Sequence, residues 1–232
     1  MSIQVIILAA GMGTRLGRPH PKPLTVLNTG QSIMAQQFER VHAAFGEAAR
    51  VTVVVGFKMD LVMEAFPDAL FVYNEVYSET NTSKSLLKGL RSTPDGGVLW
   101  LNGDVVFDQG ILESVSKYVT ADESFVCVNT ATVAEEEVKY TVDADGYIKE
   151  LSKQVVGGLG EAVGINFISR VDKPKLIQRL KECGDQDYFE RGLELAIADD
   201  GVRILPVDIS EHNAVEVDTG EDLDRANAMH SS

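Results

Sequence analysis

The sequence IQVIILAAGMGTRLGRPHPKPL at residues 3–24 joins an apolar run to a turn rich in glycine and proline. The β-branched run that opens it is typical of a buried parallel strand. Gly11 and Gly13 permit positive φ angles and close approach, so the backbone amides after the strand can converge on phosphate oxygens. Arg15 and Lys22 add positive charge, and three prolines stiffen the chain that carries Lys22. The segment therefore predicts an anion-binding loop at the end of the first strand.

Strand and helix patterns alternate beyond this loop. A helical pattern at residues 32–45 and a buried strand at 50–56 predict a βαβ unit. Similar patterns predict further helices at 58–66, 83–91, 110–118, 173–183, 188–198 and 220–229, strands at 69–73, 97–102, 124–129, 164–169 and 202–207, and a hairpin over 138–151. We expect one domain over residues 1–232, a three-layer α/β/α sandwich with a mostly parallel sheet and a small antiparallel hairpin insertion.

The charge balance limits the partners. The chain has 35 acidic and 21 basic residues and a formal charge of −14, so its averaged field repels nucleic acid and anionic membranes. An anionic small substrate then needs local cations or a metal ion. Cys127 and Cys183 lack metal-ligand spacing and are expected to be plain thiols. The N-terminal run has no signal-peptide features, and no apolar run reaches the ~20 residues of a membrane span. We expect a cytoplasmic protein. The sequence leaves open whether the protein forms a homo-oligomer.

Two other phosphate-binding loops do not fit the opening segment. The glycines do not form a GxGxxG turn that leads directly into a helix, and the Walker A pattern is absent. The string LAAGMGTRL followed by PKPL instead resembles the N-terminal signature of the sugar-phosphate and alcohol-phosphate nucleotidyltransferases. The resemblance implies a Rossmann-like fold whose opening loop wraps an NTP. It also implies roles for Arg15 and Lys22 in stabilising the α-phosphate and the departing pyrophosphate. The loop residues implied to bind nucleotide are Leu8, Ala9, Ala10, Gly11, Gly13, Thr14, Arg15 and Lys22.

Two acidic motifs extend the resemblance. NGDVVF at residues 102–107 places Asp104 at the carboxyl end of a predicted strand, where open α/β sheets bind ligands. VEVDTGEDLDRAN at residues 215–227 places Asp218 between a strand and a helix. The resemblance implies that the two aspartates bind one Mg²⁺, with Asp104 also near the nucleotide, and this ion needs few carboxylates beside phosphate and water. The alternative is that Asp104 is a turn residue and Asp218 a helix N-cap.

Further residues are implied on the acceptor side. Lys153 in ELSKQV occupies the place of a family lysine that contacts the acceptor phosphate and is taken as catalytic and substrate-binding, although an exposed strand-end lysine is the alternative. Glu161 and Gly164 in GEAVGINF resemble the acceptor-binding strand. In ETNTSKSLLKGL at residues 79–90, the implied pocket residues are Asn81 and Ser85 for the nucleotide and Thr80 and Ser83 for the acceptor. Asn81 could instead be a plain helix cap.

The compact chain resembles the choline-phosphate and inositol-1-phosphate cytidylyltransferases most. The implied reaction is Mg²⁺-dependent transfer of CMP from CTP to a small phosphorylated alcohol, polyol or phosphonate, with release of pyrophosphate. A choline acceptor requires an aromatic cage. Trp100 lies in an apolar strand, and Tyr140, Tyr147, Tyr188 and Phe189 form no recognisable set, so acceptor identity stays open. A sugar-1-phosphate transferase that uses UTP, dTTP or GTP is the alternative, and a nonenzymatic nucleotide sensor is a third.

Overall fold

The computed structural model describes residues 2–131, 133 and 136–229. The strands are β1 (Ile3–Ala9), β2 (Ala49–Val55), β3 (Leu70–Tyr73), β4 (Val98–Asn102), β5 (Val105–Phe107), β6 (Phe125–Asn129), β7 (Lys139–Val142), β8 (Ile148–Ser152), β9 (Glu161–Ile168), β10 (Leu205–Asp208) and β11 (Ala214–Glu216). The α-helices are α1 (Ile33–Phe45), α2 (Met59–Ala65), α3 (Thr82–Ser92), α4 (Gln109–Ala121), α5 (Lys173–Glu182), α6 (Phe189–Asp200) and α7 (Gly220–Ala228). Three short 3-10 helices are η1 (Thr14–Leu16), η2 (Lys22–Leu24) and η3 (Gly46–Ala48).

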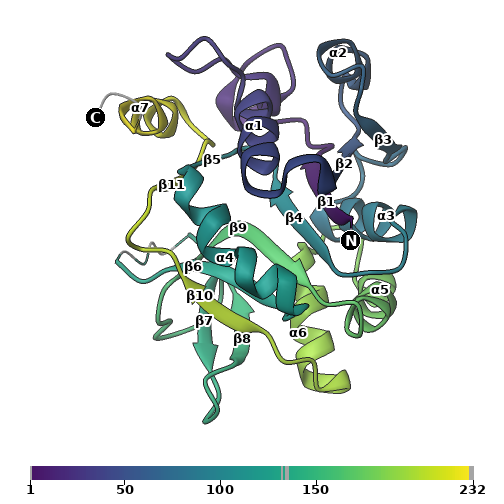
Figure 1. Cartoon of the computed structure of the whole chain (residues 1–232), viewed down its shortest axis with the longest axis vertical. Helices are drawn as coiled ribbons and strands as arrows, with labels where there is room; N and C mark the ends of the chain where they lie inside the picture. Colours follow the sequence, from purple (N-terminus) through teal and green to yellow (C-terminus); the bar gives the residue numbers. More distant parts are fainter. Residues whose placement is uncertain (1, 132, 134–135, 230–232) are drawn as a thin grey trace.

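A mixed, mostly parallel sheet forms the centre of the molecule. Its strand order is β10-β6-β9-β4-β1-β2-β3, and β7 and β8 are attached to β9 as a hairpin. β1 pairs in parallel with β2 and β4, whereas β9 runs antiparallel between β4 and β6. The fold is therefore the expected Rossmann-like α/β/α sandwich with an antiparallel hairpin insertion (Figure 1).

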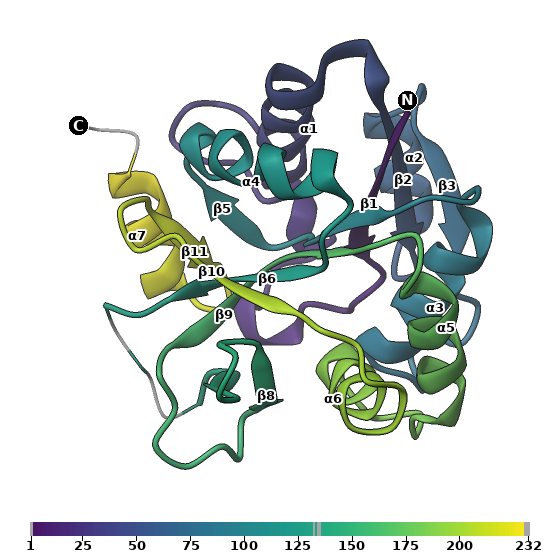
Figure 2. The ribbon, with the colours of Figure 1, turned by 60° about the horizontal axis from the view of Figure 1, so that its bottom comes forward.

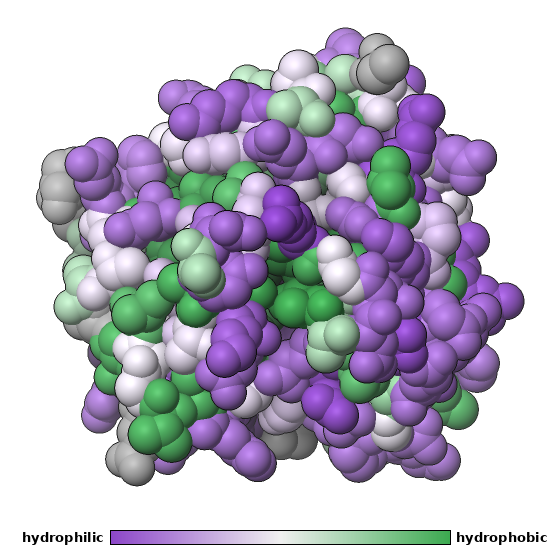
Figure 3. All heavy atoms as spheres, turned by 90° about the horizontal axis from the view of Figure 1, so that it is seen from below, coloured by the Kyte–Doolittle hydropathy of each residue, from purple (hydrophilic) through white to green (hydrophobic). Residues whose placement is uncertain are grey.

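Helices cover both faces of this sheet. One buried cluster joins the sheet to α1, α2 and α4, and a second joins the opposite face to α3, α5 and α6. Figure 2 shows α1 and α4 on one side of the sheet and α5 and α6 on the other. The face seen from below is largely hydrophilic, with hydrophobic residues gathered near its middle and lower left (Figure 3). No helix among the described residues is long and apolar enough to cross a bilayer.

Three local details differ from the sequence-based expectation. The strand expected at 202–207 is β10 at Leu205–Asp208, because residues 202–204 pack as irregular chain on the end of α6 and on the hairpin. β9 begins at Glu161, three residues before the expected start. The third difference is a two-stranded antiparallel sheet of β5 and β11, which the sequence did not indicate. This small sheet positions the candidate site.

Candidate active site

The opening loop places a lysine inside the molecule. After β1, Gly13 adopts φ +58°, and a Cβ atom there would lie 3.1 Å from Cβ of Lys22. Only glycine satisfies both conditions without strain. Two 3-10 helices follow instead of an α-helix, and the second begins at Lys22, directly after Pro21. The turn of the backbone at Gly13 thus brings Lys22 back against the loop. Gly11 has open space around it and needs no positive φ.

Lys22 forms two ion pairs across the carboxyl edge of the sheet. Its side chain is nearly buried, and Nζ lies 2.9 Å from Oδ2 of Asp104 and 2.5 Å from Oδ1 of Asp218. Burial alone lowers the pKa of Lys22, but the two carboxylates outweigh it and the net pKa is raised. Lys22 is therefore held as a cation between the two aspartates that the sequence assigned to a metal.

The small sheet explains why these aspartates meet. Asp104 lies in the turn between β4 and β5, and Asp218 follows β11. β5 pairs antiparallel with β11, with Val105 opposite Glu216, and the amide of Val217 donates to the carbonyl of Asp104 at 2.9 Å. Two motifs that are distant in sequence thus become neighbouring backbone segments. The expected convergence of Asp104 and Asp218 is present in the structure.

Glu216 is a third acidic member that sequence reasoning missed. One carboxylate oxygen each of Asp104, Glu216 and Asp218 lies within 4.8 Å of the others. The charge of Asp104, burial and the charge of Asp218 raise the pKa of Glu216 well above its usual range. The available signal was the alternation VEVD, because residues two apart share one side of an extended strand. Three carboxylates this close repel one another, and a cation bound between them would stabilise their ionised forms.

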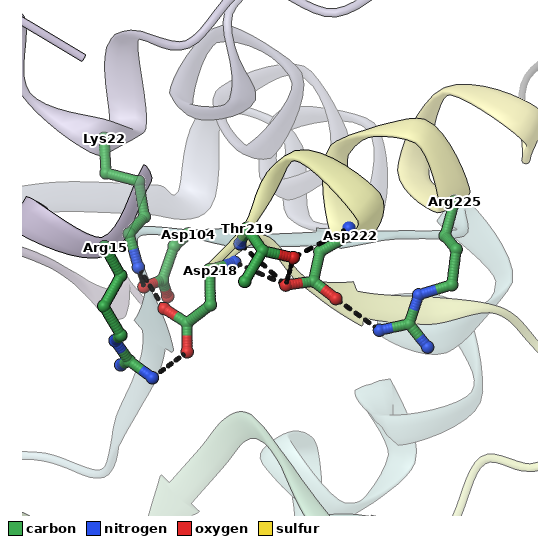
Figure 4. A network of polar contacts seen from close by, with 7 residues as sticks. All are labelled: Arg15, Lys22, Asp104, Asp218, Thr219, Asp222 and Arg225. Carbon is green, nitrogen blue, oxygen red and sulfur yellow. Dashed lines mark hydrogen bonds and ion pairs between the residues drawn. The ribbon is translucent and has the colours of Figure 1, made fainter. Parts of the chain in front are cut away.

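Arg15 completes the charged group. Its Nη1 lies 2.7 Å from Oδ2 of Asp218, and Figure 4 shows Arg15, Lys22, Asp104 and Asp218 pointing toward one another. Asp218 is not the helix N-cap, which corrects that alternative. Thr219 is the N-cap of α7, in a reciprocal capping box with Asp222. The carboxylate of Asp218 is therefore directed to the two cations rather than to the helix end.

The turns around this group are tightly packed. The amide of Gly103 donates to the carbonyl of Leu8 at 2.9 Å, and a Cβ at Gly103 would lie 2.5 Å from that oxygen. Ala9 is the last residue of β1, and the carbonyl of Ala10 accepts from Phe57 at 3.1 Å. Gly164, in β9, has φ +74°, and a Cβ there would lie 2.7 Å from Nδ2 of the Asn102 side chain. Thr14 begins η1, but its side chain is outside the described part of the structure.

The residues at the start of α3 are engaged within the protein. Asn81 is the N-cap of α3 and accepts from the amide of Thr82, so the capping interpretation is confirmed. The hydroxyls of Thr80 and Ser85 both accept from the side chain of Asn74 at 3.1 Å. Ser83 is fully buried, and its Oγ has no hydrogen-bond partner among the described residues. Contact of these residues with nucleotide or acceptor stays a prediction.

Lys153 follows β8 and is exposed to solvent. Its Nζ lies 5.4 Å from the centroid of the Tyr188 ring. The pKa of Glu137 is raised by burial, by the charge of Glu161 and by the charge of Asp218. The positive charge of Lys153 acts in the opposite direction. The charges of Lys153 and of Asp218 therefore both act on Glu137. Glu161 begins β9, opposite Asn129 and Lys139.

Comparison with known proteins gives a family and a fold. The family model described as the MobA-like NTP transferase domain matches residues 5–184, which covers the opening loop and Asp104 but ends before Glu216 and Asp218. A CMP-5'-(3-aminopropyl)phosphonate synthase from Streptomyces rubellomurinus is 27% identical over 250 residues. The match covers 99% of this chain but only 39% of that relative.

Two solved structures have the same fold. The inositol-1-phosphate CTP transferase from T. maritima superposes with a TM-score of 0.82 at 16% identity, covering 99% of this chain and 95% of that one. The CTP:phosphocholine cytidylyltransferase from Streptococcus pneumoniae superposes with a TM-score of 0.76 at 17% identity, covering 99% of this chain and 100% of that one.

Proposed function

Because the chain belongs to the MobA-like NTP transferase domain family, we propose that it is a Mg²⁺-dependent cytidylyltransferase. It transfers CMP from CTP to a small phosphorylated alcohol, polyol or phosphonate and releases pyrophosphate. The relative named for CMP-aminopropylphosphonate synthesis supports CTP and a phosphono acceptor. We propose that the reaction takes place in the cytoplasm.

One observation carries the proposal, the meeting of Arg15 and Lys22 with Asp104 and Asp218 at the carboxyl edge of the sheet. Ligands of open α/β sheets bind at this edge. The cations suit a triphosphate, and the carboxylates suit the divalent ion that accompanies it. An acidic protein has to concentrate both charges locally to bind such an anion.

The donor set fits a magnesium ion. Asp104, Glu216 and Asp218 offer three carboxylate oxygens within 4.8 Å of one another, at the end of β4 and beside β11. Mg²⁺ prefers oxygen ligands and keeps sites for phosphate oxygens and water. When bound, the ion would neutralise charge that develops on the phosphates. We assign the ion to Asp104 and Asp218, with Glu216 as a third candidate ligand.

The protein side chains then act by position and charge. The acceptor's phosphate or phosphonate oxygen attacks the α-phosphorus of CTP, the bond to the bridging oxygen breaks, and pyrophosphate leaves with the electron pair. A phosphate is already a competent nucleophile at neutral pH, so the reaction needs no general base. Lys22 and Arg15 stabilise the charge that builds on the α-phosphate and the leaving group, and Lys153 orients the acceptor.

A panel of nucleotides and acceptors tests the proposal. The purified chain is assayed for pyrophosphate with CTP, UTP, dTTP and GTP, each with 3-aminopropylphosphonate, inositol 1-phosphate, phosphocholine and glucose 1-phosphate, with and without Mg²⁺. We expect turnover that requires both Mg²⁺ and CTP, and that uses one or more of 3-aminopropylphosphonate, inositol 1-phosphate and phosphocholine as the acceptor. Turnover only with UTP, dTTP or GTP and the sugar phosphate would favour the alternative. Absence of pyrophosphate in every combination would contradict the transferase proposal and favour a nucleotide sensor.

A further inference from the structure

The side chain of Lys153, the residue assigned to the acceptor, lies over the face of an aromatic ring of the same chain. The ammonium of Lys153 lies 5.4 Å from the ring centroid of Tyr188, the residue directly before α6. Tyr188 is 46% exposed, so a ligand can reach the same ring from solvent. A cation over a tyrosine face is attracted by the negative potential of the ring. The ring is thus a favourable place for an ammonium group.

A buried carboxyl group lies two residues further on. Glu190 is 8% exposed, and its Oε2 has no hydrogen-bond partner among the described residues. Burial raises the pKa of Glu190 to about 7, while the positive charge of Lys153 acts in the opposite direction. A buried carboxyl without a full set of partners is costly, and a nearby cation relieves that cost. Lys153 is the cation that supplies this relief in the ligand-free protein.

The surroundings fix these two groups in place. Phe189, between them, packs edge-on against the buried Trp100, with ring centroids 5.6 Å apart. The amide of Leu151, in β8, donates to Glu194 of the next turn of α6 at 3.3 Å, which ties the helix to the hairpin. The ring of Tyr188 and the carboxyl of Glu190 are therefore held on a rigid element beside the strand that leads to Lys153.

We propose that Tyr188 and Glu190 form a subsite for the ammonium group of a zwitterionic acceptor, an aminoalkyl phosphonate or aminoalkyl phosphate. Lys153 occupies the subsite in the ligand-free protein and is released to the anionic end of the acceptor when the acceptor's ammonium replaces it. The exchange keeps each charge paired, because one ammonium leaves the ring as another arrives. This inference rests on the proposed transferase function, since it names the acceptor of that reaction.

The chemistry of the subsite favours a cation over a polyol. A hydroxyl group gains little from an aromatic face, whereas an ammonium gains from both the ring and the carboxylate. Burial disfavours the ionised form of Glu190, and an ammonium group beside the carboxylate would stabilise that form. A polyol acceptor would leave that carboxyl without a compensating charge.

Calorimetry with two matched probes tests the subsite. 3-Aminopropylphosphonate and n-propylphosphonate differ only in the amine, and each is titrated into the protein with and without Mg²⁺ and a nonhydrolysable CTP analogue. We expect the amine probe to bind at least about tenfold more tightly to the wild type. Glu190→Gln and Tyr188→Leu should bring the ratio of the two affinities close to one, whereas Tyr188→Phe, which keeps the ring, should retain it.

A control variant separates the subsite from a general loss of aromatic packing. Tyr147, on the hairpin, also lies under a cation, the guanidinium of Arg203 at 4.8 Å, and Tyr147→Leu should leave the ratio unchanged. Equal affinity of the wild type for both probes, or a ratio retained in both Glu190→Gln and Tyr188→Leu, would overturn the inference. Amine-selective binding without pyrophosphate from any NTP would contradict the proposed function alone. Turnover of both probes with equal affinity would contradict the subsite alone.

Discussion

Nζ of Lys22 lies 2.9 Å from Oδ2 of Asp104, although 82 residues separate them in the chain. The same ammonium contacts Asp218, so one cation pairs with two of the three clustered carboxylates and offsets only part of their charge. In the nucleotide-bound protein, we expect the divalent ion to take over this neutralisation and Lys22 to turn to the phosphates. This exchange leads to the first three predictions.

The aspartates should be essential for turnover but not for the fold. Asp104→Ala and Asp218→Ala each remove a carboxylate that is partly exposed and faces cations, so we expect pyrophosphate release to fall at least about a hundredfold. Pyrophosphate assays measure the rate, and thermal melting measures the stability. A rate near that of the wild type in either variant would remove our site assignment.

Lys22 should contribute chiefly to the transition state. We expect Lys22→Ala to raise the barrier by several kcal/mol, roughly a hundred- to thousandfold in kcat, as for other preorganised electrostatic stabilisers. Lys88→Ala is the matched control, because Lys88 pairs with Glu75 on an exposed surface. A loss confined to KM, or an equal loss in the control, would argue against this role.

Metal binding should depend on what neutralises the acidic group. With Lys22 and Arg15 already paired to the carboxylates, we expect weak binding of Mn²⁺ alone and tighter binding when CTP is present. Lys22→Met removes the competing cation and should strengthen binding of Mn²⁺ alone several-fold. Calorimetry and Mn²⁺ electron paramagnetic resonance measure both affinities. Unchanged or weaker Mn²⁺ binding in Lys22→Met would contradict the exchange.

Glu190 should make stability fall as pH rises. Its pKa is raised to about 7 in the folded protein, whereas an unfolded glutamate titrates near 4.5, so the unfolded state loses its proton first. The stabilising contribution is complete below pH 4.5 and is lost as pH rises to about 7. The shift corresponds to a loss on the order of 3 kcal/mol.

Urea unfolding at several pH values measures this effect. Glu190→Gln cannot ionise, so its free energy of unfolding should decline less than that of the wild type between pH 4.5 and pH 8. Parallel pH profiles for the two proteins would show that Glu190 does not titrate in this range.

Much of the sheet was predictable from local pattern. Buried strands such as β1 and β2 appear as β-branched runs, and amphipathic helices such as α1 appear through their spacing, because both signals lie within one segment. β5 and β11 have only three residues each and are stabilised by pairing with one another. Such short strands carry no period of their own, so β5 was not expected, and the strand expected before Asp218 gave no sign of its pairing with β5.

The candidate site was predictable where its residues belong to local sequence motifs, and not where they meet through long-range packing. Arg15, Lys22, Asp104 and Asp218 belong to recognisable motifs, and the structure brings them together. Glu216 was missed because its side of the strand is set by the unforeseen pairing of β11 with β5. The contact of Lys153 with Tyr188 was missed because it joins the hairpin to α6, and long-range packing of this kind leaves no local pattern.

A crystal structure with CTP and Mn²⁺ tests the central claim most directly, because anomalous scattering locates the manganese without reference to activity. We predict a manganese peak between the carboxylates of Asp104 and Asp218, the triphosphate along residues 11–15, and Nζ of Lys22 in contact with phosphate oxygens. A nucleotide bound elsewhere, or a triphosphate in place while Lys22 stays paired to both aspartates and no manganese lies between them, would contradict it.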